Sequence, residues 1–213
     1  AAGSPIAAAA KAARDVLVNR FPAQAVSIEA TYLNYLAANG LLPTDAGVLV
    51  GQAAALNIIN RRANDGSFPP NPEVFIGGTA PGEWRPTPPA FAPMSAPWFG
   101  AVVPYALKDS TGLLPEPSPP EQTALAYCYA DNFLALLDRV LRAIAAAHLT
   151  DIGDSARLFA LAHIAGTDAL ISAWDNKRYY FFWRPSTAIV NGDDDGNPQT
   201  EGDATWQPLI DDP

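Results

Sequence analysis

The sequence has few of the residues that most often build catalytic and metal sites. Its 213 residues include one cysteine, Cys128, and only two histidines. A single cysteine excludes a disulfide within the chain, and no histidine or cysteine spacing typical of a zinc site occurs. Cys128 lies in an apolar run of helical character, where we expect it to be a small buried side chain.

Positive charge and long apolar runs are also scarce. Thirteen lysines and arginines stand against 22 acids, which gives a net charge of −9. This balance disfavours nucleic acid as a partner, because no basic face is present to displace counterions. No apolar run reaches the roughly 18–20 residues that a membrane-spanning helix needs, so we expect no membrane span.

Helical patterns dominate the N-terminal third of the sequence and return in its C-terminal half. Residues 5–65 are rich in Ala and Leu, carry apolar residues at spacings of three and four, and include Asp45 as a candidate N-cap. Helices are expected again over residues 121–148 and from about 154 towards 183. Either Asp151 or Asp154 could cap the second of these. Nothing alternates in the manner of a strand, so the pattern predicts an all-α fold.

Two segments depart from this pattern. Residues 66–120 hold fourteen of the 21 prolines together with several aromatic rings. We expect them to form an ordered, extended loop that covers the helices, because the rings need a surface to pack on. Residues 190–213 are acidic and read as a linker. The prediction is a single helical domain over residues 1–213 that continues into a part outside this sequence.

The acidic linker partly matches the ligand spacing of a calcium-binding loop. With Asn191 at position 1, Asp193 and Asp195 fall at positions 3 and 5 of an EF-hand-like loop. The glutamate required at position 12 is replaced by Gly202. We therefore expect a solvated acidic turn.

The segment from Trp174 to Ile189, WDNKRYYFFWRPSTAI, gathers cations among aromatic rings. Lys177 and Arg184 are seven residues apart, which is two turns and one face of a continuous helix. Trp174 shares that face, as does Phe181, whereas Arg178 points elsewhere. Because Pro185 disfavours α geometry in the residue before it, the helix is expected to end at Arg184.

Two interpretations of these cations remain open. Their aliphatic stems could lie on the core with the charges in water. Alternatively, Lys177 and Arg184 could hold an oxyanion, since an ammonium and a planar guanidinium suit a tetrahedral anion, and aromatic walls strengthen the attraction.

Lys177, six intervening residues and then Arg184-Pro185 resemble the first signature of the vanadium-dependent haloperoxidase and type-2 phosphatidic acid phosphatase (PAP2) superfamily. The similarity includes the preceding RLFALAHIAGTDALISAWDNK and the following DGNPQTEGDATWQPLI. The proline-rich GEWRPTPPAF is also similar to a loop of the secreted bacterial haloperoxidase-like branch.

The resemblance implies a helical bundle that binds vanadate or phosphate. Lys177 and Arg184 would be the oxyanion-binding and catalytic residues, and Trp174 would line the pocket. The implied reaction is oxidation of halide by hydrogen peroxide, or hydrolysis of a small phosphoester in the phosphatase branch. A secreted or periplasmic location is implied as well, and a homo-oligomer is possible.

The superfamily has two further signatures, Pro-Ser-Gly-His and Ser-Arg followed by a histidine, and neither occurs in residues 1–213. We expect a continuation of the protein, or a companion chain, to carry them. His163 lies 14 residues before Lys177, about 21 Å along a continuous helix, so it cannot share a ligand with that lysine and is expected to be a core histidine. His148 is expected near a helix end. A non-catalytic helical interaction module is the alternative of another class.

Overall fold

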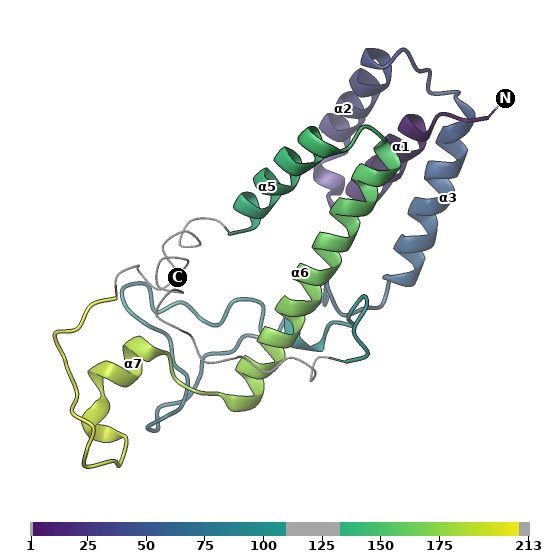
Figure 1. The fold of residues 1–213 in the computed structure, drawn as a ribbon. Coiled ribbons are helices and arrows are strands. Elements are labelled where there is room, and N and C mark those ends of the chain that lie inside the picture. The colour runs from purple at the N-terminus through teal and green to yellow at the C-terminus, as the bar shows by residue number, and fades with distance from the viewer. Residues whose placement is uncertain (1, 110–132, 209–213) are drawn as a thin grey trace. The chain divides into compact units, whose positions relative to one another are not determined.

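The computed structural model describes residues 2–109 and 133–208 (Figure 1). The described helices are α1 (Pro5–Arg20), α2 (Ala25–Ala38), α3 (Ala46–Arg61), α5 (Phe133–His148), α6 (Ile152–Tyr180) and α7 (Pro185–Val190), with 3-10 turns η1 (Pro22–Gln24), η2 (Phe99–Ala101) and η4 (Gly192–Asp194). These residues form no strand, and one isolated bridge pairs Glu83 with Phe182. The all-α prediction is confirmed. Cys128 and the expected helix over 121–132 lie outside the described residues.

The chain divides into two compact units. The first comprises Ala1–Asp65 and Leu134–His163, and the second comprises Gly66–Phe133 and Ile164–Pro213. The expected single domain over 1–213 stays a prediction, and each unit is considered by itself.

In the first unit α1 packs against both α2 and α3. Its core is formed by the buried side chains of Ala7, Tyr32 and Leu36. Gly47 and Gly51 lie one turn apart on α3, and a Cβ atom at either position would collide with a carbonyl oxygen of α1. Small residues on this face of α3 therefore allow the two backbones to approach closely.

Carboxylates cap the helices where the sequence predicted caps. The Oδ1 of Asp45 accepts hydrogen bonds from the backbone N–H of Gly47 at 2.7 Å and of Ser4 at 2.8 Å. These two donors lower the pKa of Asp45. Of the two candidates before α6, Asp151 is the cap, because its Oδ1 accepts from the N–H of Gly153 at 2.8 Å and of Asp154 at 3.1 Å.

The second unit is organised by the proline-rich loop and the C-terminal part of α6. The buried carboxylate of Asp168 accepts hydrogen bonds from the backbone N–H of Tyr105, Ala106 and Leu107 at 2.6, 2.7 and 3.0 Å. The described part of the loop, residues 66–109, is thereby fastened to α6, while residues 110–120 lie outside the described chain.

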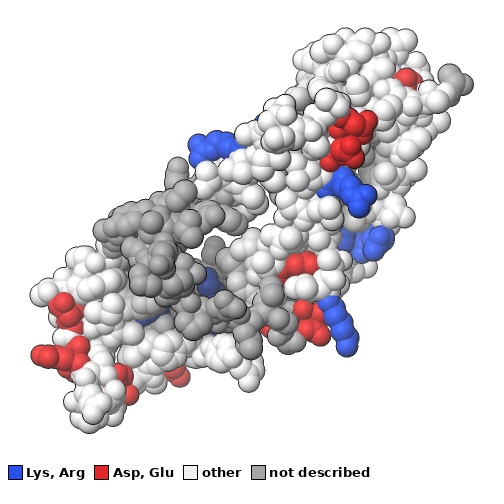
Figure 2. All heavy atoms as spheres, in the orientation of Figure 1, with Lys and Arg blue, Asp and Glu red and all other residues white. Residues whose placement is uncertain are grey.

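Acidic side chains gather over the segment that follows α7, at the lower left of the face shown in Figure 2. None of the described helices combines the length and the apolar character that a bilayer span requires.

Candidate oxyanion site

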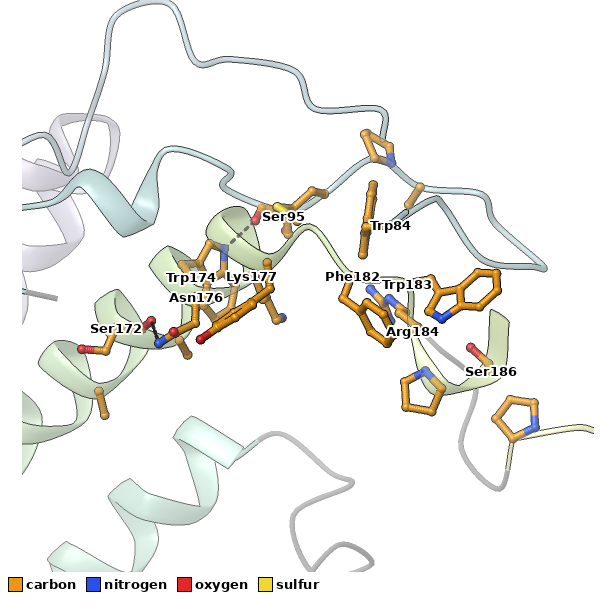
Figure 3. Close-up of a pocket in the computed structure, with 18 of the residues that line it drawn as sticks. Trp84, Ser95, Ser172, Trp174, Asn176, Lys177, Phe182, Trp183, Arg184 and Ser186 are labelled. Carbon is orange, nitrogen blue, oxygen red and sulfur yellow. Dashed lines mark hydrogen bonds between the residues drawn. The ribbon is translucent and has the colours of Figure 1, made fainter. Parts of the chain in front are cut away.

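A cavity of about 1050 Å³ lies in the second unit, between the proline-rich loop, the end of α6 and the start of α7 (Figure 3). Among the described residues, Lys177 and Arg184 are the only cations that line it, and no acidic residue does. The other charged, polar and aromatic lining side chains are Trp84, Ser95, Ser172, Trp174, Asn176, Tyr180, Phe182, Trp183, Ser186 and Trp206. An aromatic cavity with two cations and no carboxylate is suited to an anion.

The helix that carries Lys177 ends earlier than predicted. α6 stops at Tyr180, and Phe181 has a φ of 50°, which is outside the helical range. The Phe181 carbonyl accepts the N–H of Trp84 at 2.8 Å, and Trp183 donates its N–H to the Gly82 carbonyl at 2.9 Å. Pairing with the proline-rich loop therefore replaces the last helical turn.

Arg184 consequently does not share a helix with Lys177, and the predicted helix end at Arg184 is wrong. Arg184 is instead the N-cap residue of α7, with Pro185 in the first turn of that helix. Proline suits this position because its missing N–H would be unpaired there anyway. The turn still brings Arg184 to the cavity that Lys177 lines.

The Lys177 ammonium lies over the indole of Trp174, with Nζ 4.4 Å from the ring centroid. Burial lowers the pKa of Lys177, and the charge of Arg184 lowers that pKa further. Lys177 as a whole residue is exposed, while its ammonium group is partly desolvated. Both effects make the charged form of Lys177 less favourable than it is in water, and an anion in the cavity would offset them.

The ring of Trp174 is held in place from the loop. Its Nε1–H donates to the Ser95 carbonyl at 2.8 Å (Figure 3). Its ring also meets that of Phe99 edge-on, with centroids 5.8 Å apart. The plane on which the lysine rests is thus set by the proline-rich loop as well as by α6.

Arg178 turns to the loop. Its Nη1 donates to a Glu73 carboxylate oxygen at 2.6 Å, and its guanidinium lies 5.4 Å from the Phe75 ring centroid. Phe75 in turn packs edge-on against Phe181, with centroids 5.4 Å apart. The cation next to Lys177 therefore has a structural partner, which agrees with the prediction that it points elsewhere.

Comparisons with known proteins match the segment that contains the cavity cations. Residues 157–213 match the family model described as the VCPO second helical-bundle domain. Vanadium chloroperoxidase from Curvularia inaequalis is 46% identical over 56 residues, which are 26% of this chain and 8% of that protein. Residues 157–213 are therefore similar to a domain of the vanadium haloperoxidase family. The match spans under one tenth of the relative, so the activity of the whole protein is a matter for proposal.

Neither histidine is among the residues that line the cavity. His163 is not a core residue as predicted: its side chain is 50% exposed and lies 3.2 Å from a carboxylate oxygen of Asp138. Its Nδ1 is 2.8 Å from the Phe159 carbonyl, one turn earlier on α6. Polar partners at both ring nitrogens explain why the imidazole stays at the surface. His148 is the last residue of α5, as expected.

The acidic residues with calcium-loop spacing accept hydrogen bonds from backbone N–H groups of the linker. Asp193 accepts from the N–H of Gly202 at 3.0 Å, and Asp195 accepts from the N–H of Asn197 at 2.6 Å. Nowhere in residues 2–109 and 133–208 do three His, Cys, Asp or Glu side chains come together as metal ligands.

The sequence analysis did not identify several residues that line the cavity or hold the loop beside it. Trp84 and Ser95 reach the cavity from the proline-rich loop, and Trp206 reaches it from the acidic linker. The special role of Asp168 could have been inferred, because it is the one acid in an otherwise mostly apolar helical run, HIAGTDALISAW. The sequence held no signal for the Ser95 carbonyl, because any residue can provide a backbone oxygen.

Proposed function

We propose that the cavity binds vanadate through Lys177 and Arg184, and that the complete protein uses this site to oxidise halide with hydrogen peroxide. The observation that carries the proposal is the presence of two cations, and no described carboxylate, on one aromatic cavity. The similarity of residues 157–213 to known proteins supports it, because both matches bear the name of a vanadium chloroperoxidase or its domain.

The donor set fits a tetrahedral oxyanion. Arg184 offers a planar fork of N–H donors, and Lys177 offers a compact charge. The pKa of Lys177 is lowered in part by Arg184, so the two cations repel one another across the cavity. An anion between them would relieve this repulsion and would stabilise the charged lysine. Vanadate and phosphate both meet this requirement.

The chemistry that vanadate supplies when bound is activation of hydrogen peroxide toward halide. In the proposed mechanism Lys177 donates hydrogen bonds to the oxyanion oxygens and neutralises negative charge on them. Arg184 orients the anion through paired N–H donors. Trp174 supports the lysine, and the indoles of Trp84 and Trp183 keep water from the charged groups, which strengthens the attraction.

Vanadate titration of the complete protein, combined with halogenation of monochlorodimedone, tests the proposal. We expect vanadate-dependent turnover in the wild type and its loss in Lys177→Ala. Absence of vanadate-dependent turnover in the complete protein would exclude the peroxidase activity. Hydrolysis of p-nitrophenyl phosphate that vanadate inhibits would identify a phosphatase on the same site. A Lys177→Ala protein unchanged in every activity and in partner binding would favour a non-catalytic module.

A further inference from the structure

The proline-rich loop runs antiparallel to the end of α6. Pro97 lies beside Arg178, where its carbonyl is 3.5 Å from Nη1 of the arginine. Eight to ten residues later, the backbone of Tyr105 to Leu107 meets Asp168, more than two turns earlier on the helix. The stretch 95–107 therefore follows α6 from Arg178 back to Asp168, on the side of the helix that carries these two residues.

Asp168 fastens one end of this stretch. Its side chain is buried, with 3% of the residue exposed, and one carboxylate receives the N–H groups of three consecutive loop residues. Hydrogen bonds to an ionised acceptor are about twice as strong as bonds between neutral groups. Asp168 does not line the cavity, so its contact with the site is indirect.

Gly100 allows the middle of the stretch to lie directly on the helix backbone. A Cβ atom built on Gly100 would be 2.6 Å from the Asp175 nitrogen and 2.7 Å from its Cα. Such distances are too short for any side chain, and the neighbouring atoms are backbone atoms that cannot rotate away. Only glycine permits the present separation of loop and helix.

The far end of the stretch reaches the site itself. The Ser95 carbonyl accepts the indole N–H of Trp174 at 2.8 Å. The face of the same indole carries the Lys177 ammonium, whose Nζ is 4.4 Å from the ring centroid. A cation is attracted to the face of an indole, so the orientation of the ring decides where the ammonium rests. The path from Asp168 to Lys177 thus runs through the loop backbone and one ring.

We propose that the stretch 95–107 is a positioning element of the oxyanion site, in which Asp168 and Gly100 hold the loop on α6 so that the Ser95 carbonyl orients Trp174 beneath Lys177. Asp168 and Gly100 are positioning residues, since neither touches the cavity. The inference rests on the proposed oxyanion binding for its functional meaning, but the orientation of Lys177 can be measured without any anion.

The pKa of Lys177 reports on this arrangement, because it depends on how far the ammonium is desolvated. Burial is the main cause of its lowered pKa. If the loop leaves the helix, Trp174 is released and the ammonium regains water, so its pKa rises toward the ordinary value. A loop that serves only overall stability would leave the titration of Lys177 unchanged in any variant that still folds.

The experiment compares Gly100→Ala with Gly166→Ala in the full chain. Both substitutions add one methyl group to the second unit, but nothing lies within 4 Å of a Cβ at Gly166. The chain has three lysines, Lys11, Lys108 and Lys177, so NMR of ¹³C-dimethylated lysines resolves the Lys177 titration. Calorimetry with inorganic phosphate then measures the oxyanion affinity, and circular dichroism confirms that each variant is folded.

We expect Gly100→Ala to raise the Lys177 pKa and to weaken phosphate binding about tenfold, the usual effect of losing a group that orients a ligand. Gly166→Ala keeps both values at wild type. A folded Gly100→Ala protein with wild-type titration and wild-type affinity would overturn the inference.

If Gly100→Ala does not fold, the Trp174→Phe variant tests the inference, because phenylalanine keeps an aromatic ring but lacks the N–H that the Ser95 carbonyl accepts. It is expected to change both values in the same direction, and wild-type values would overturn the inference.

Asp168→Asn tests the other anchor, since it removes the charge and replaces one acceptor oxygen with a donor. The same upward shift of the Lys177 pKa is expected. A wild-type protein that binds no phosphate or vanadate would reject the proposed function, whereas the Lys177 titration would still decide the positioning role.

Discussion

The Lys177 ammonium lies 4.4 Å from the centroid of the Trp174 ring, three residues earlier on α6. This spacing brings the two side chains together on one helix face. Arg184 reaches the same cavity from the N-cap of α7 and lowers the pKa of the lysine. The aromatic contact supports the charge of Lys177, and the second cation opposes it.

Removal of either cavity cation is expected to weaken oxyanion binding strongly. A hydrogen bond to a charged group contributes about 1.5–3 kcal/mol, which is roughly a tenfold to 150-fold change in affinity. Lys177→Gln and Arg184→Gln should each show this loss for vanadate in isothermal titration calorimetry.

Arg178→Gln is the matched control, because that cation neighbours Lys177 in sequence and pairs with Glu73. Its vanadate affinity should stay within about twofold of wild type. Equal losses in all three variants would mean that net charge, and not the cavity, holds the anion.

Oxyanion binding is expected to weaken as pH rises through the lowered pKa of Lys177. That pKa lies below the ordinary 10.5 of lysine in the free protein, and a bound anion raises it by stabilising the charged form. Binding therefore takes up protons between the two values. Sulfate is a suitable probe because its charge is constant in this range, and calorimetry in buffers of different ionisation enthalpy measures the uptake.

Lys177→Arg supplies the control for this pH dependence. Arginine keeps its charge throughout this range, so the affinity of the variant for sulfate should not fall as pH rises. A decline as steep as that of the wild type would assign the titration to another group.

The packing of α1 on α3 predicts an unusual response to alanine. Glycine to alanine within a helix ordinarily stabilises by up to about 1 kcal/mol. At Gly51 the new Cβ would collide with the Ala8 carbonyl, so Gly51→Ala should lower the free energy of unfolding by about 1–3 kcal/mol. Chemical denaturation measures this change. A stabilised Gly51→Ala protein would show that α1 and α3 are not in such close contact.

A buried ion pair lies at the C-terminal end of α3. The Nε of Arg62 donates to Oδ2 of Asp65 at 2.6 Å, and the residues are only 8% and 6% exposed. Arg62→Leu leaves the carboxylate buried without this partner and should cost about 3–5 kcal/mol of unfolding free energy. The double variant with Asp65→Leu should recover most of that loss in the same denaturation assay. Equal costs for the single and double variants would argue against coupling of the two charges.

The helices and their caps were predictable because they depend on neighbours in the sequence. Asp45 was predicted as a cap, and it binds the N–H two residues ahead. The choice between Asp151 and Asp154 could not be made in advance, since both satisfy the same local rule. His163 was misplaced because the sequence does not show that Asp138, 25 residues earlier, lies beside it.

By itself the sequence determined the all-α class, the helix starts and the two cations of the family signature, because propensity, capping and residue spacing act over a few residues. Only the tertiary structure decided where α6 ends and which surfaces complete the cavity. The backbone of Phe181 to Trp183 pairs with residues of the proline-rich loop far earlier in the chain, and this pairing replaces a helical turn. Lys177 and Arg184 therefore meet at one cavity through a bend that local helical periodicity could not foresee.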